Sequence, residues 1–120
     1  MNTSQDYIIA IPTYNRPNII IKKTLKLLKE YDIPNDKIII FVKDQEQMNL
    51  YKDIILNYNL VLTGASGIME TRNTIQAFFY YETSYTNVVY IDDDISGLYN
   101  MDKKLDNLDS FITKAFIDTK

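Results

Sequence analysis

The chain of 120 residues contains no histidine and no cysteine. Without cysteine, disulfides, zinc–thiolate sites and thiol nucleophiles are excluded. Without histidine, imidazole metal ligands and histidine-based catalytic triads are excluded as well. Any metal ion must therefore be bound by oxygen, which favours a hard cation such as Mg²⁺ or Mn²⁺. Acid–base chemistry would fall to Asp, Glu, Lys or Tyr.

Positive charge, glycine and proline are also scarce. The net charge is -3, and only Arg16 and Arg72 among the 13 basic residues are arginine, which argues against a nucleic-acid backbone binder. With 3 Gly, 3 Pro and 46% hydrophobic residues, the composition is that of a globular domain. No stretch is long enough to cross a bilayer, and the start lacks the features of a signal peptide, so we expect a cytoplasmic protein of the source or host cell.

Short apolar runs alternate with longer amphipathic stretches along the chain. The runs predict buried strands, and the stretches between and after them predict helices. The strands are expected at residues 7–11, 37–42, 60–62 and 88–91, and the helices at residues 17–31, 45–57, 67–81 and 105–117. This alternation predicts βαβ units and an α/β fold, a Rossmann-like parallel sheet in a three-layer α/β/α domain with no internal boundary.

Polar clusters fall where the predicted strands end. They are residues 12–16, 43–45, 63–67 and 92–94. Because ligands of open parallel sheets bind beyond the carboxyl ends of the strands, we expect this edge to carry the site.

Three consecutive acids, Asp92, Asp93 and Asp94, follow the fourth predicted strand. In an extended backbone Asp92 and Asp94 would face one way and Asp93 the other. Two carboxylates on one side suit a divalent cation that also takes phosphate oxygens and water. The alternative is a solvated acidic turn in which Asp94 caps a short helix. We favour the metal interpretation.

The loop between Pro12 and Pro17 carries a hydroxyl, an aromatic ring, an amide and a guanidinium. Tyr14 is suited to stack on a base, and Arg16 to bind phosphate with its planar fork. The alternative is a plain strand–helix turn in which Thr13 or Asn15 caps the helix. Both interpretations can hold at once.

Two further positions are ambiguous. Asp44 is suited to accept a hydrogen bond from a base or ribose, or to cap the following helix, and the residues leave both open. Arg72 shares a helical spacing with Ile68, Ile75 and Phe79, which predicts that it faces the sheet. A lone buried charge is costly, so we expect the acid cluster or a ligand phosphate to pair with it. The alternative is an internal ion pair without a catalytic role.

Together these segments resemble the GT-A glycosyltransferases, especially the glycosyltransferase family 2-like group. The matching parts are Ile11–Pro17 for the loop after the first strand, Asp44 for the acid that contacts the base, Gly67 with Arg72 and Asn73 for the helix start, and Asp92–Asp94 for the DxD motif. Residues 67–75 and 91–95 also look like the TET/GREB-associated glycosyltransferase group. Some of its members are proposed to glycosylate hydroxymethylated pyrimidines in phage DNA, which implies a viral or phage origin.

The resemblance implies an enzyme that transfers a sugar from a nucleotide-diphosphate sugar. A UDP-sugar is the first candidate for this donor. Asp92 and Asp94 would hold Mn²⁺ or Mg²⁺ on the diphosphate, and Asp93 would be the catalytic contact to sugar hydroxyls. The acceptor would be a modified DNA base, a glycan or a protein. The implied nucleotide-binding residues are Pro12, Thr13, Tyr14, Arg16, Asp44, Gly67, Arg72, Asn73 and Asp92.

The resemblance covers residues 6–100, whereas a complete GT-A domain has about 200 residues. We therefore expect residues 1–120 to form one truncated domain, the nucleotide-diphospho-sugar-binding half. The alternative function is a non-catalytic nucleotide- or nucleotide-sugar-binding module. A TOPRIM nuclease and a receiver domain are disfavoured, because each needs acids after the first strand, where Pro12–Asn15 stand. An incomplete sheet would expose an edge that suits a second copy of the chain.

Overall fold

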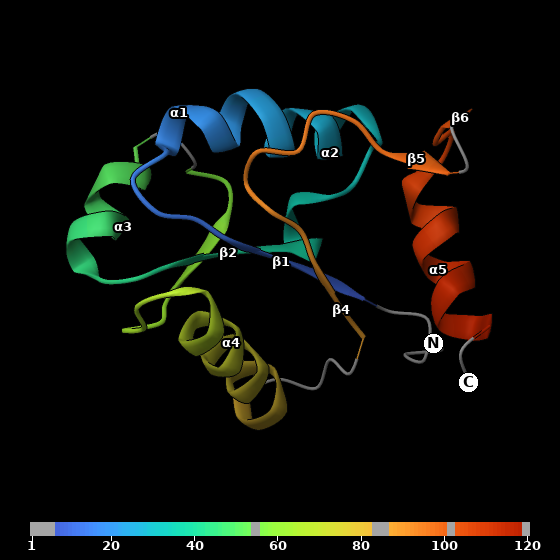
Figure 1. Cartoon of the computed structure of the whole chain (residues 1–120). Coiled ribbons are helices and arrows are strands. Elements are labelled where there is room, and N and C mark those ends of the chain that lie inside the picture. Colours follow the sequence, from blue (N-terminus) through green and yellow to red (C-terminus); the bar gives the residue numbers. More distant parts are fainter. Residues whose placement is uncertain (1–6, 54–55, 83–86, 101–102, 119–120) are drawn as a thin grey trace.

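A computed structural model describes residues 7–53, 56–82, 87–100 and 103–118. Four parallel strands form one sheet in the order β3-β2-β1-β4 (Figure 1). They are β1 (Ile8–Pro12), β2 (Ile38–Val42), β3 (Asn59–Leu62) and β4 (Val88–Tyr90). This confirms the α/β class, and each strand lies within one residue of its predicted bounds.

The helices alternate with the strands, as the apolar periodicity predicts. The first is continuous and consists of α1 (Pro17–Ile20), a π-helical segment (Ile21–Leu25) and α2 (Lys26–Glu30). The others are a 3₁₀ turn (Asn35–Lys37), α3 (Gln45–Tyr51), α4 (Ile68–Glu82) and α5 (Leu108–Asp118). Pro17 occupies the first helical position, where its missing N–H costs nothing.

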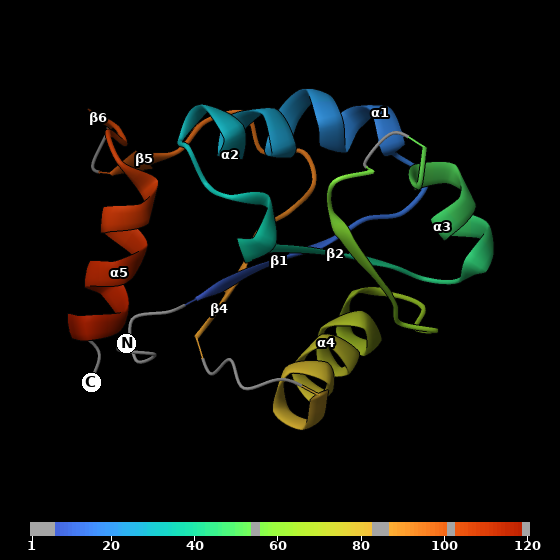
Figure 2. The ribbon, with the colours of Figure 1, turned by 180° about the vertical axis from the view of Figure 1, so that it is seen from behind.

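The sheet is covered on both faces, because its strands are apolar on both sides. Figures 1 and 2 show α1 and α2 along one face and α4 along the other. The first face packs side chains of alternating strand positions against helical ones, among them Ile9, Ile11, Ile40, Ile20, Leu28, Tyr51 and Ile112. The second face does the same with Ile8, Ala10, Phe41, Ile75 and Phe79. Burying one such isoleucine contributes about 1.5–3 kcal/mol, so these two clusters hold the layers together.

The direction in which successive strands are added to the sheet reverses at β1. From β1 the chain adds β2 and then β3 on one side, and then crosses back to place β4 on the other side of β1. In doubly wound sheets such a switch point opens a crevice at the carboxyl ends of the strands. The strand order therefore places the crevice between the ends of β1 and β4.

Two predicted helix ends are wrong. The helix predicted to Asn57 ends at Tyr51, because β3 must begin at Asn59 to pair with Ile39; residues 54–55 lie outside the described part. The last helix begins at Leu108 rather than 105, since the side chain of Asn107 accepts a hydrogen bond from Ser110 N at 2.8 Å and caps it.

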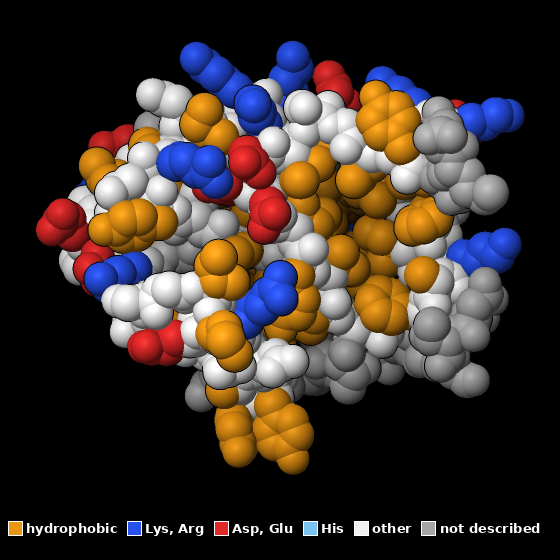
Figure 3. All heavy atoms as spheres, viewed as in Figure 1, with side chains coloured by type: hydrophobic (Ala, Val, Ile, Leu, Met, Phe, Trp, Pro, Cys, Tyr) orange, Lys and Arg blue, Asp and Glu red, His pale blue; other side chains and the backbone are white. Residues whose placement is uncertain are grey.

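A short antiparallel hairpin, β5 (Tyr99–Asn100) with β6 (Lys103–Lys104), precedes that helix and was not predicted. In Figure 3, hydrophobic side chains gather in a hollow between β4 and α5. Among the described strands β4 pairs only with β1, so it forms an edge of the sheet. Its pairing with a second copy stays a prediction. Within the described residues, no helix has the length and apolar character needed to cross a membrane.

Candidate functional site

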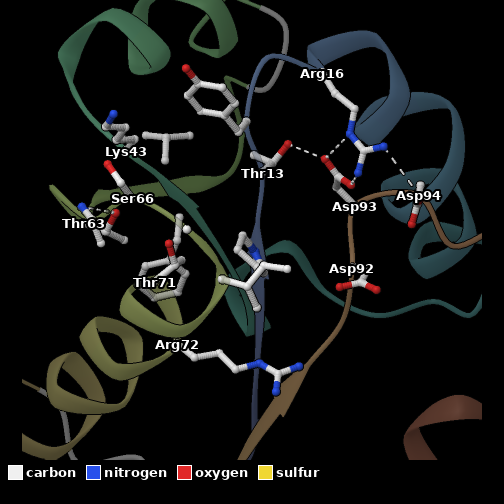
Figure 4. A pocket seen from close by; sticks show the side chains of 17 residues that line it. Thr13, Arg16, Lys43, Thr63, Ser66, Thr71, Arg72, Asp92, Asp93 and Asp94 are labelled. Carbon is white, nitrogen blue, oxygen red and sulfur yellow. Dashed lines mark hydrogen bonds and ion pairs between the residues drawn. The ribbon is translucent and has the colours of Figure 1, made fainter.

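A pocket of about 740 Å³ lies at the carboxyl edge of the sheet. Its walls come from the loop after β1, the end of β2, the loop after β3, the first turns of α4 and the acids after β4 (Figure 4). This is the edge that the polar clusters predict, and the volume falls in the range of small-molecule sites, about 300–1,000 Å³.

Most of the predicted site residues line this pocket. They are Pro12, Thr13, Tyr14, Arg16, Gly67, Arg72, Asp92, Asp93 and Asp94. Asp44 and Asn73 are not among the lining residues. The structure thus brings together residues from two separate strand ends and one helix start, while each ligand contact assigned to them stays a prediction.

Asp93 is the buried member of the acid triplet, with 3% of its surface exposed. Thr13 Oγ1 donates to Asp93 Oδ2 at 2.7 Å, and Arg16 Nε donates to the same oxygen at 3.2 Å. Arg16 Nη2 donates to Asp93 Oδ1. Both oxygens of Asp93 are therefore engaged by the protein, and this geometry gives no support to a contact between Asp93 and sugar hydroxyls.

The pairing also changes the electrostatics of Arg16. The hydrogen bond to Asp93, together with the negative charge of that carboxylate, raises the pKa of Arg16 above its usual value. Arg16 Nη1 lies 3.6 Å from Asp94 Oδ2, so the guanidinium spans two of the three acids. Arg16 therefore holds the acid triplet, and a contact between Arg16 and phosphate stays a prediction.

Asp92 and Asp94 are exposed at the pocket wall. Within the described part of the chain, the side chain of Asp92 has no hydrogen bond or ion pair. A turn at Asp93 and Asp94 interrupts the extended backbone, and residues 95–98 are not helical, so the alternative of Asp94 as a helix cap is wrong. Two carboxylates remain whose oxygens face the pocket.

If a divalent cation bound in this pocket, its protein ligands would be the carboxylates of Asp92 and Asp94. The described residues contain no group of three or more acidic side chains arranged to hold a metal ion. Asp92 and Asp94 would therefore supply part of an oxygen shell, which a ligand's phosphate and water would have to complete. Two carboxylates fit Mg²⁺ or Mn²⁺ as long as phosphate and water oxygens supply the remaining ligands.

The loop after β1 is anchored by α3. Arg16 N donates to Tyr51 Oη at 2.9 Å, and Tyr51 Oη lies 2.7 Å from Thr13 Oγ1. Because Thr13 gives its single proton to Asp93, Tyr51 must donate to Thr13. The result is a directed chain of hydrogen bonds that ends on the buried carboxylate, in which each bond strengthens the next.

A second pair of contacts fixes Asn15, whose φ of 54° is in the left-handed region. Asn15 N donates to Gln47 Oε1 at 2.8 Å, and Gln47 Nε2 donates to Asn15 Oδ1 at 2.6 Å. Gln47 is 3% exposed, so α3 holds this loop with a buried amide. The predicted caps by Thr13 and Asn15 are wrong, since Arg16 occupies the cap position and no side chain caps the helix.

Asp44 caps α3. Its carboxylate accepts a hydrogen bond from Gln47 N at 3.0 Å, which satisfies one of the free amides at the start of that helix. The capping alternative is thus confirmed, and the side chain does not line the pocket. A contact between Asp44 and a base stays a prediction.

Arg72 lies in the first turns of α4 and is exposed to the pocket. Its expected burial against the sheet beside Ile75 is wrong, because its side chain is exposed, although its charge reaches Tyr90 of β4. Within the described residues Arg72 has no hydrogen bond or ion pair with protein, and it lies across from Asp92 in Figure 4.

Sequence reasoning gave no individual role to four polar lining residues, although three of them lie in segments predicted to form this edge. They are Lys43, Thr63, Ser66 and Thr71. Lys43 and Thr63 directly follow β2 and β3, so their place at strand ends was the available signal.

Comparisons of the chain with protein-family models, with curated proteins and with solved structures find no match.

Proposed function

We propose that the pocket binds a nucleotide-diphosphate sugar together with Mn²⁺ or Mg²⁺, and that the protein is a glycosyltransferase or the donor-binding part of one. The observation that carries the proposal is the arrangement of charge in one pocket. Within the described residues Arg72 has no hydrogen bond or ion pair, and its charge reaches Tyr90 of β4. Asp92 and Asp94 present carboxylates in the same pocket.

This arrangement suits a diphosphate. A phosphate group would meet the guanidinium of Arg72, which binds such oxygens through parallel hydrogen bonds. Asp92 and Asp94 would repel the same phosphate unless a cation lies between them, so a cation and a diphosphate satisfy this pocket jointly. When bound, the cation neutralises the charge that develops on a leaving diphosphate.

The remaining lining residues have roles in the same proposal. Tyr14 is 54% exposed at the pocket and offers a ring for stacking on a base. Lys43, Ser66 and Thr71 line the pocket and offer an ammonium and two hydroxyls for ribose or sugar oxygens. The resemblance of the loop after β1 and of the acid triplet to GT-A enzymes supports the same assignment.

A second candidate is a module that binds the nucleotide sugar without turning it over. The occupied state of Asp93 favours it, because Thr13 and Arg16 engage both carboxylate oxygens. Asp93 was the side chain expected to contact the sugar. The two candidates predict the same binding and differ only in product formation.

Calorimetry with UDP, in the presence and absence of Mn²⁺, tests the binding. We expect Mn²⁺-dependent binding by the parent, and at least a tenfold loss, about 1.4 kcal/mol, in the double variant Asp92→Asn with Asp94→Asn. The double variant Asp36→Asn with Asp106→Asn makes the same change of charge at exposed positions outside the pocket and should bind like the parent.

Equal binding by the parent and the Asp92/Asp94 variant would refute the cation site. Release of UDP from a UDP-sugar supports the transferase, whereas Mn²⁺-dependent binding without release supports the binding module. Absence of UDP binding by the parent would reject both candidates.

A further inference from the structure

The hydroxyl of Thr24 joins the two ends of the acidic turn. Thr24 Oγ1 donates to the carbonyl oxygen of Asp92 at 2.6 Å and accepts from the backbone N–H of Ile95 at 2.9 Å. Thr24 is fully buried, with 0% of its surface exposed. One buried hydroxyl thus satisfies a donor and an acceptor that are three residues apart.

Thr24 lies in the helix that directly follows β1, 68 positions before Asp92. It belongs to the π-helical segment Ile21–Leu25 between α1 and α2. A threonine inside a helix usually turns its hydroxyl to the carbonyl of the preceding turn, where it serves only its own helix. Here the bonds leave the helix, and π-helical segments of this kind occur frequently at functional sites.

The turn that Thr24 joins contains all three acids. Asp92 O and Ile95 N are the groups that close a four-residue turn with Asp93 and Asp94 at its centre. With these ends held on Thr24, Asp93 is directed to Arg16 and is buried, while Asp92 and Asp94 remain at the pocket wall. The hydroxyl therefore fixes which carboxylates face the pocket.

We propose that Thr24 is a positioning residue for the cation–diphosphate site: its hydroxyl sets the conformation of the Asp92–Ile95 turn and thereby the affinity for a nucleotide diphosphate with its cation. The inference rests on the proposed function for its ligand. Thr24 does not line the pocket, so it acts on the ligand only through the turn.

The test compares Thr24→Val with Thr24→Ser. Valine keeps the shape of threonine and lacks the hydroxyl, whereas serine keeps the hydroxyl and lacks the methyl group. Ile20→Val is the control, because Ile20 is a fully buried residue of the same helix that has no contact with the turn through hydrogen bonds. The Ile20→Val change should lower the stability of the protein and leave the Asp92–Ile95 turn intact.

Two quantities are measured on each variant. The first is the affinity for UDP in the presence of Mn²⁺, where we expect Thr24→Val to bind about tenfold more weakly and Thr24→Ser to bind like the parent. The second is the hydrogen exchange of the Ile95 amide. We expect faster exchange in Thr24→Val alone, because only that variant removes the buried hydroxyl that accepts from this amide.

Weakened binding in Thr24→Val, rescued in Thr24→Ser and absent in Ile20→Val, supports the inference. Equal loss in the valine and serine variants overturns it, because the methyl packing would then be responsible. Unchanged affinity and unchanged Ile95 exchange in Thr24→Val also overturn it. If the parent does not bind UDP with Mn²⁺, the proposed function and the affinity claim fail together, and Ile95 exchange alone still decides whether Thr24 holds the turn.

Discussion

Arg16 and Asp93, 77 positions apart in sequence, form the ion pair that joins the end of β1 to the end of β4. Asp93 is 3% exposed, while the side chain of Arg16 is 47% exposed. The pair therefore has one buried and one solvated partner. The pair links the two strand ends on either side of the switch point and leaves Asp92 and Asp94 at the pocket.

We expect Arg16→Gln to destabilise the fold by about 1–2 kcal/mol, because the buried carboxylate of Asp93 loses its cation. The value is low for a buried pair, since water screens the exposed guanidinium. Urea unfolding measures it, with Lys26→Gln, exposed on α2, as the control. The double variant Arg16→Gln with Asp93→Asn should recover part of the loss. Unfolding of Arg16→Gln at the parent's urea concentration would contradict the assignment.

Arg72→Gln should weaken binding of UDP in the presence of Mn²⁺ by about tenfold without a measurable change in stability. The reason is that Arg72 has no hydrogen bond or ion pair among the described residues. Its charge reaches Tyr90, but both side chains are exposed and water screens that interaction. Calorimetry and thermal unfolding measure the two effects. Lys114→Gln, which removes the same charge from α5, is the control and should change neither. A lower melting temperature together with normal binding would assign Arg72 to the fold instead.

Replacing Asp32 by glycine should stabilise the protein by about 0.5–1 kcal/mol. Asp32 follows α2 with a φ of 60°, and the helix ends with Ile33 N donating to Leu28 O and Asp32 N donating to Lys29 O, each at 3.0 Å. Glycine is the residue that this helix ending favours, and the change also removes an acid from the negative end of the helix dipole.

The melting temperature should rise by several degrees in Asp32→Gly. Asp32→Asn separates the two causes, because it removes the charge and keeps the Cβ atom. An equal rise in both variants would mean that charge alone is responsible. A fall in Asp32→Gly would show that backbone strain at this position is negligible.

Stability should decrease above about pH 10, in part through Tyr7. Burial of Tyr7, its hydrogen bond to Asp109 Oδ1 at 2.6 Å and the charge of that carboxylate raise the pKa of Tyr7 well above its usual value. Below pH 10 both states are protonated and the contribution is complete. Above it the unfolded chain loses the proton first, so the free energy of unfolding falls as the pH rises.

The free energy of unfolding, measured by urea at about pH 8 and about pH 11, gives the size of this decrease. In Tyr7→Phe the decrease should be smaller. It should not disappear, because burial also raises the pKa of Tyr51, Tyr58 and Tyr90. Tyr80→Phe, at a position 79% exposed, should follow the parent. A parent-like decrease in Tyr7→Phe would remove Tyr7 from the explanation.

The parts of the site that could be predicted from sequence are those that lie at strand ends. Asp92 to Asp94 and the loop after β1 directly follow apolar runs, so their common edge follows from parallel pairing alone. Arg72 could not be placed in this way. Its helical spacing predicts burial against the sheet, but the folded structure leaves it exposed at the pocket.

The sequence also could not show which of the three acids is buried and which two face the pocket. Alternation in an extended strand would give Asp92 and Asp94 one direction and Asp93 the other. Asp93 does differ from its neighbours, but because a turn and the contacts with Arg16 and Thr13 bury it. No local pattern contains those partners.

By itself, the sequence determined the four apolar strands, the order of strands and helices, and the exclusion of every histidine or cysteine chemistry. These follow from local periodicity and composition, which any short window of the chain carries. Only the tertiary structure decided that Arg16 is bound to Asp93, that Asp44 is a cap, and that Thr24 joins the ends of the acidic turn. Two of these, the Arg16 pair and the Thr24 bridge, connect residues about seventy positions apart, where the packing of helices on a sheet sets the partners.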